Sequence, residues 1–150
     1  MKLILTNDYN MQKKTEILID FKNMISRIEN SIKKHNNELK DTIDYYNYNA
    51  KAYRNSKNPK IQTLIKEFNK RIEAYKQNMN KHIQKEKDFL NEIKNKLKNI
   101  TEENLNYLEK NKTSLIKKEN ELAMFAPKPN DLKPLLDKMF DLNNPFDFNF

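Results

Sequence analysis

Glycine does not occur anywhere among the 150 residues of the chain. Glycine is the residue that most cheaply adopts positive φ, and it is typical of tight hairpin turns, phosphate-binding loops and nucleophile elbows. A compact sheet protein needs many tight turns. The absence therefore disfavours β-rich folds and enzymes built on those motifs, and it favours long helices joined by few turns.

Cysteine is absent as well. Neither a disulfide nor a thiolate metal site can form, which excludes disulfide-stapled secreted modules. The apolar opening, MKLIL, is too short for the core of a signal peptide and far too short to span a bilayer. We therefore expect an intracellular or virion location, no transmembrane segment and no secretion through a signal peptide.

Apolar and charged residues occur in unusual proportions. Apolar residues make up 37% of the sequence and charged residues 33%. Globular domains contain about 45–50% apolar and about 25% charged residues. Only 3 of the 29 basic residues are arginine, and lysine, asparagine and isoleucine are abundant. This usage indicates an AT-rich genome, so codon bias itself contributes to the lysine count.

A first helical arm is predicted over residues 8–54. Its apolar residues recur at alternating steps of three and four, which keeps one narrow stripe of an α-helix facing the same way, as in a coiled-coil seam. The predicted seam and oligomer contacts of this arm are Leu18, Phe21, Ile25, Ile28, Ile32, Leu39 and Tyr46.

A second helical arm is predicted over residues 59–100. Asn58 is a good helix cap, and Pro59 suits the first helical position. Because the connection is short, the two arms should be antiparallel neighbours. The predicted contacts of this arm are Ile61, Leu64, Phe68, Ile72, Tyr75, Met79, Ile83, Leu90, Ile93 and Leu97.

A reversal near Ser56 sets the register between the arms. Residue i of the first arm then faces roughly residue 112 minus i of the second, as two helices of equal rise require. In this register His35 lies opposite residues 76–77. His82 lies near residues 29–30, about a turn and a half from His35. Since no Glu-x-x-His or HExxH arrangement accompanies them, we predict no metal ligand and no cofactor.

Catalysis has no support in the sequence either. The serines have no adjacent base-and-orienter set, and the carboxylates neighbour lysines, as solvated ion-pair faces do. We therefore predict no catalytic residue and a protein that is not an enzyme.

Two arrangements fit the chain beyond residue 100. Thr101 followed by Glu102 and Glu103 is typical of a helix start, so a third helix over 102–125 can fold back onto the hairpin. Because no proline or glycine intervenes, one continuous helix over 59–125 fits equally well and needs another chain to cover its end. The predicted fold is all-α in both cases: a long antiparallel, coiled-coil-like hairpin.

The C-terminal part, residues 127–150, is predicted to be a separate docking tail behind the rod of residues 1–126. Pro127 and Pro129 end the preceding helix, and Asp131 caps a short amphipathic helix. Spaced phenylalanines follow, which is typical of peptides that insert side chains into a partner's pockets. The predicted docking residues are Leu132, Leu135, Leu136, Met139, Phe140, Pro145, Phe146, Phe148 and Phe150.

Positive charge is concentrated in one part of the chain. Residues 51–100 contain 14 lysines and arginines against 5 acidic residues. Such a face attracts phosphate backbones or anionic lipid, although the scarcity of arginine argues against base-specific readout. The candidate anion-binding residues are Lys66, Lys70, Arg71 and Lys76.

These observations predict a structural or assembly protein. It would oligomerise, or staple larger subunits through its aromatic tail, as a virion or scaffold component of a virus or phage does. The alternative is a basic helical protein that binds nucleic acid or an anionic membrane. A third hypothesis is a chain that is largely unfolded alone and becomes helical when bound.

Overall fold

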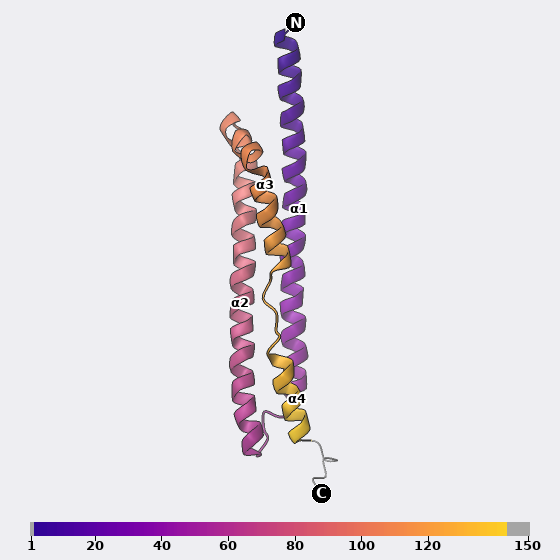
Figure 1. The fold of residues 1–150 in the computed structure, drawn as a ribbon, viewed down its shortest axis with the longest axis vertical. Helices are drawn as coiled ribbons and strands as arrows, with labels where there is room; N and C mark the ends of the chain where they lie inside the picture. The colour runs from indigo at the N-terminus through magenta and orange to yellow at the C-terminus, as the bar shows by residue number, and fades with distance from the viewer. Residues whose placement is uncertain (1, 144–150) are drawn as a thin grey trace. The chain divides into compact units, whose positions relative to one another are not determined.

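The computed structural model describes the backbone of residues 2–143 and the side chains of residues 11–143 (Figure 1). In this range the chain forms α-helices and no strands. The helices are α1 (Lys2–Ala50), α2 (Pro59–Lys98), α3 (Glu102–Met124) and α4 (Leu132–Leu142). Since α1 and α2 pack against each other, the prediction of an all-α helical hairpin is confirmed.

The chain divides into two compact units, and α1 and α2 pass through both. Unit 1 comprises Met1–Lys34 and Ile83–Ala126, and unit 2 comprises His35–His82 and Pro127–Phe150. Each unit has its own apolar core. The predicted division into a rod and a separate tail stays a prediction.

The core of unit 1 is built by three helices. Ile17, Phe21, Met24 and Ile28 come from α1; Phe89, Leu90 and Ile93 come from α2; Leu108 and Leu115 come from α3. Figure 1 shows α3 beside α1 and α2 in this unit. The third helix therefore covers a face that a two-helix hairpin would leave open.

A local cap starts α3. The Thr101 hydroxyl accepts a hydrogen bond from the Asn104 backbone N–H at 3.2 Å. Glu102 and Glu103 occupy the first turn, where the helix dipole favours negative charge. Of the two arrangements considered above, the structure has the break after Lys98 and the separate third helix.

Two ion pairs between α1 and α3 of unit 1 show the direction of α3. Lys112 contacts Asp20 at 2.6 Å, and Arg27 contacts Glu119 at 2.8 Å. Both pairs join residues 92 positions apart. A constant separation of this kind means that α1 and α3 run in the same direction.

The core of unit 2 includes the short C-terminal helix. Leu132, Leu135 and Met139 of α4 pack in one cluster with residues of α1 and α2. The other buried members are Tyr46, Ala50, Tyr53, Ile61, Ile65, Phe68 and Ile72. The amphipathic helix predicted after Asp131 is present, and it packs on the chain itself.

Turns at the bend of unit 2 join α1 to α2. The Tyr53 N–H donates to the Ala50 carbonyl and the Ser56 N–H to the Tyr53 carbonyl, at 2.9 and 3.1 Å. The Asn58 side chain accepts from the Lys60 N–H at 2.9 Å, which fits the cap predicted from Asn58 and Pro59.

Most of the predicted seam is buried. The buried members are Phe21, Ile28, Tyr46, Ile61, Phe68, Ile72, Tyr75, Met79, Ile83, Leu90 and Ile93. The half-buried members are Leu18, Ile25, Ile32, Leu39, Leu64 and Leu97. The apolar face is wider than predicted, because α3 and α4 also bury Ile17, Met24, Ala50, Ile65 and Phe89. The role of these residues in oligomer contacts stays a prediction.

None of the described helices combines the length and the apolar character that crossing a bilayer requires.

Candidate functional site

The two histidines lie together, which corrects the predicted register. In unit 2 the rings of His35 and His82 meet edge to face, with centroids 5.4 Å apart and an angle of 77° between planes. The predicted register placed residues 76–77 opposite His35. Residue 82 lies about five positions further along α2, so the register prediction was wrong by more than one helical turn.

The bend explains this shift. The chain continues in turns over residues 51–55 after the end of α1, so the reversal is not centred on Ser56. Tyr53 of these turns and Ile61 of the first turns of α2 are buried in the same cluster. The turns and the start of α2 therefore share one apolar cluster, and His35 faces a later residue of α2 than the predicted register gave.

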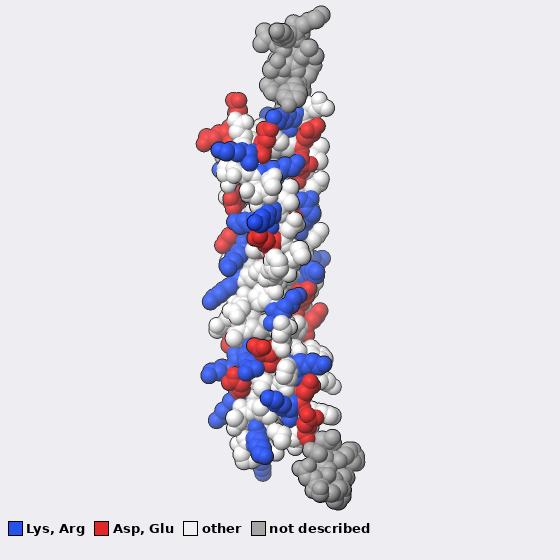
Figure 2. Space-filling model, viewed as in Figure 1, with Lys and Arg blue, Asp and Glu red and all other residues white. Residues whose placement is uncertain are grey.

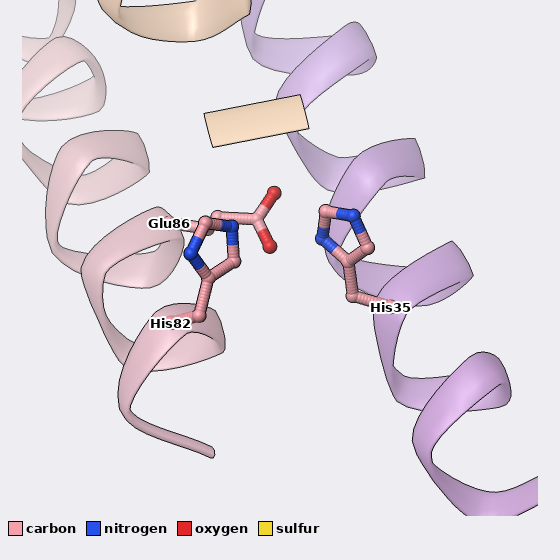
Figure 3. A group of neighbouring side chains, drawn as sticks. All are labelled: His35, His82 and Glu86. Atoms are coloured by element: carbon pink, nitrogen blue, oxygen red, sulfur yellow. The ribbon is translucent and has the colours of Figure 1, made fainter. Parts of the chain in front are cut away.

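Glu86 lies one helical turn after His82 on α2. It follows His82 by four residues on the same helix, so both side chains project from one face. Figure 3 shows His82 and Glu86 on α2, and the ring of His35 on α1 turned toward that of His82.

His35 in unit 2 and Glu86 in unit 1 are both buried. His35 is 2% exposed and Glu86 is 1% exposed, while His82 is half-buried. Buried polar groups are costly unless they are hydrogen-bonded. In unit 1 the Ser31 hydroxyl lies 2.5 Å from a carboxylate oxygen of Glu86 and donates a hydrogen bond to it.

A cavity of about 210 Å³ lies beside Glu86 in unit 1. Ser31, Glu86, Phe89 and Leu122 line it, together with Arg27 and Glu119. A space of this size admits water molecules. The carboxylate of Glu86 is therefore adjacent to a space that solvent or a small ligand can occupy.

Arg27 and Glu119 line this cavity as an ion pair. The guanidinium donates two hydrogen bonds to the carboxylate, at 2.8 and 2.9 Å. The hydrogen bond to Glu119 raises the pKa of Arg27 above its ordinary value, against the opposing effect of burial. Because each charge is held by the other, neither is a free charge facing Glu86.

The candidate anion-binding residues do not form a purely cationic surface. Arg71 pairs with Glu67 at 3.0 Å, and Lys76 is exposed. Lys66 and Lys70 line an open groove of unit 2 that Glu67 and Glu73 also line. Figure 2 shows basic and acidic groups interspersed on the visible face. Their role in anion binding stays a prediction.

The predicted docking tail is split between the core and the surface. Leu132, Leu135 and Met139 are buried in unit 2, and Leu136 is half-buried. Phe140 is 61% exposed. The remaining predicted residues, Pro145, Phe146, Phe148 and Phe150, lie outside the described residues.

Exposed aromatic groups occur on the last turns of α1 and on α4. Tyr45 and Tyr48 are 59% and 80% exposed. By contrast Tyr46 and Tyr53 are buried, and burial raises the pKa of both phenols. Tyr45, Tyr48, Phe140 and Leu142 are the large apolar side chains of unit 2 that are exposed among the described residues, and we call this set the aromatic end of unit 2.

No family model matches the chain, and neither a curated protein nor a solved structure is found to be similar to it.

Proposed function

We propose that the chain is a non-enzymatic assembly component that contacts other protein subunits through the aromatic end of unit 2 and the tail behind it. The observation that carries the proposal is the exposure of Tyr45, Tyr48, Phe140 and Leu142. Exposed aromatic side chains are enriched at the energetic centres of protein interfaces.

The packing of unit 2 supports this reading. Met139 is fully buried, which fixes the rotation of α4 and leaves its neighbour Phe140 facing outward. Tyr46 fixes the last turns of α1 in the same way and leaves Tyr45 and Tyr48 in solvent. None of these exposed rings can turn inward without losing a buried neighbour, so a partner surface is the remaining way to cover them.

The sequence after Asn143 adds to the proposal. It contains Phe146, Phe148 and Phe150 in alternation with polar residues, which suits insertion into pockets or addition to a sheet edge. The small size and the lysine- and asparagine-rich composition extend the proposal to a virion or scaffold component of a virus or phage.

The test is a pair of variants with matched surface changes. Tyr48→Ser with Phe140→Ser alters the aromatic end, and Met124→Ser with Phe125→Ser alters two side chains of unit 1 that are 69% and 70% exposed. We expect the first variant, and deletion of residues 144–150, to lose incorporation into the native assembly and self-association in sedimentation experiments. The second variant should keep both, and circular dichroism should show equal helicity in all.

Unchanged incorporation and sedimentation of the Tyr48→Ser, Phe140→Ser variant would reject the proposal. An anionic surface is the second candidate partner, because Lys66 and Lys70 lie exposed on one groove. Salt-sensitive retention on DNA, RNA or anionic vesicles, lost on changing both lysines to glutamate, would favour that alternative.

A further inference from the structure

We propose that the cavity beside Glu86 in unit 1 binds a small organic cation, a protonated amine that carries one ring or a short branched chain. The cavity has a volume of about 210 Å³, and its lining residues belong to unit 1 alone. The inference does not depend on the proposed assembly role. It rests on the arrangement of the lining, on its charge and on its size.

The cavity has an exposed rim and a buried floor. The exposed lining residues, which form the rim, are Arg27, Asn120 and Ala123. The buried ones are Ile28, Glu86, Phe89 and Glu119, and Ser31 and Leu122 are half-buried. A ligand that enters at the rim therefore meets an aromatic ring, aliphatic side chains and the carboxylate of Glu86.

The charges of the lining favour a cation. Arg27 and Glu119 compensate each other through two hydrogen bonds, so the three charged lining residues sum to the one negative charge of Glu86. The Ser31 hydroxyl donates to one oxygen of this carboxylate, and a carboxylate has acceptor sites for several donors. A ligand ammonium group would donate a charge-assisted hydrogen bond, which is about twice as strong as a neutral one.

The C-terminal end of α3 adds to the negative potential. Leu122 and Ala123 line the cavity from the last turn of this helix, where the carbonyl groups carry the negative end of the helix dipole. This turn contains no basic residue. Lys118, one turn earlier, lies over the Phe89 ring and pairs with Glu92 at 3.7 Å. A cation from outside the chain therefore has a favourable position beside the last turn.

The volume limits the ligand to about one ring. A cavity of about 150 Å³ with apolar walls holds benzene, so 210 Å³ suits a ring of this size that carries an ammonium group. Ile28, Phe89 and Leu122 provide apolar contacts for the ring. Benzylammonium meets these requirements, and benzyl alcohol has nearly the same shape without the charge. This pair of probes separates recognition of charge from burial of apolar surface.

The competing interpretation is a cavity that only water fills. Ordered water commonly occupies polar cavities and bonds to buried polar groups there. A water-filled cavity predicts no saturable binding of either probe. A cation site predicts saturable binding that prefers benzylammonium.

The experiment titrates the full chain with each probe and follows binding by NMR. Benzylammonium should bind at one site, with nuclear Overhauser contacts to the Phe89 ring and the Leu122 methyl groups. Its affinity should exceed that of benzyl alcohol by about tenfold or more, because of the stronger hydrogen bond to a charged group. Glu86→Gln keeps the shape of the side chain and should remove this preference. Glu103→Gln, an exposed carboxylate on α3, is the matched control and should keep it.

Blocking the rim is a second test that leaves the buried groups in place. Ala123→Phe puts a large side chain at an exposed lining position and should abolish binding of both probes. Ser114→Phe, at an exposed position of α3 away from the cavity lining, should bind like the native chain.

Unchanged binding in Ala123→Phe overturns the proposal, as does a Glu86→Gln chain that keeps the native preference. Two results on the native chain overturn it even if Glu86→Gln fails to fold. One is equal affinity for the two probes, and the other is the absence of contacts between benzylammonium and Phe89 or Leu122.

Discussion

Replacing Met139 by alanine should lower the free energy of unfolding by about 2–5 kcal/mol, the usual cost of truncating a buried methionine. Met139 is fully buried in the core of unit 2, and truncation leaves a cavity that the surrounding helices close only in part. Urea denaturation followed by circular dichroism measures this change.

The adjacent residue is the control for this experiment. Phe140 is 61% exposed, so Phe140→Ala should change the free energy of unfolding by less than about 1 kcal/mol. Equal, small effects of the two substitutions would show that α4 does not pack on unit 2. The helix would then be a free docking peptide, as the sequence predicted.

Leu108→Ala should have a comparable effect in unit 1. Leu108 is fully buried where α3 packs on α1 and α2, so its truncation should cost about 2–5 kcal/mol. Met124→Ala lies on the same helix at a side chain that is 69% exposed and should cost less than about 1 kcal/mol. Denaturant unfolding compares the two variants directly.

The result for Leu108 separates the two arrangements that the sequence allowed. In a helix that continued past residue 100, this leucine would lie on a surface left for another chain. Its truncation would then leave the unfolding of the isolated chain unchanged. A cost below about 1 kcal/mol at Leu108 would contradict the position of α3.

The helical hairpin could be predicted from periodicity alone. The step pattern that selected Phe21, Ile28, Phe68 and Ile93 depends only on neighbouring turns of a helix, and all four are buried. The break after Lys98 was harder to predict, because Thr101 is a cap without a proline or glycine nearby. Whether such a cap ends the preceding helix depends on tertiary packing, here the burial of Leu108 and Leu115.

The register could not be predicted because it depends on the bend. The turns over residues 51–55, and the buried cluster that Tyr53 shares with Ile61, are products of the fold. An error of about five residues left the seam residues apolar on both sides, so the pattern gave no warning. The same error separated His35 from His82.

Glu86 was missed for a different reason. It lies between Lys85 and Lys87, which is typical of a solvated surface carboxylate. Its position nevertheless continues the steps of three and four from Ile83 to Leu90. A carboxylate at a seam position therefore indicated a buried polar residue at Glu86.

The burial of α4 was missed because the predicted stripe was too narrow. Ala50 and Ile65 were left out of it, and both lie in the cluster that holds Leu132. A hairpin with this wider apolar face can bury a short helix.

Zero-length cross-linking of native lysines to carboxylates tests most directly whether the chain folds back on itself. A carbodiimide should join Lys112 to Asp20 and Lys13 to Glu109, whose charged atoms lie 2.6 and 2.5 Å apart. Peptide mass spectrometry of mixed light and heavy chains should find both links within single chains. Their absence, or links that form only between chains, would contradict the fold described above.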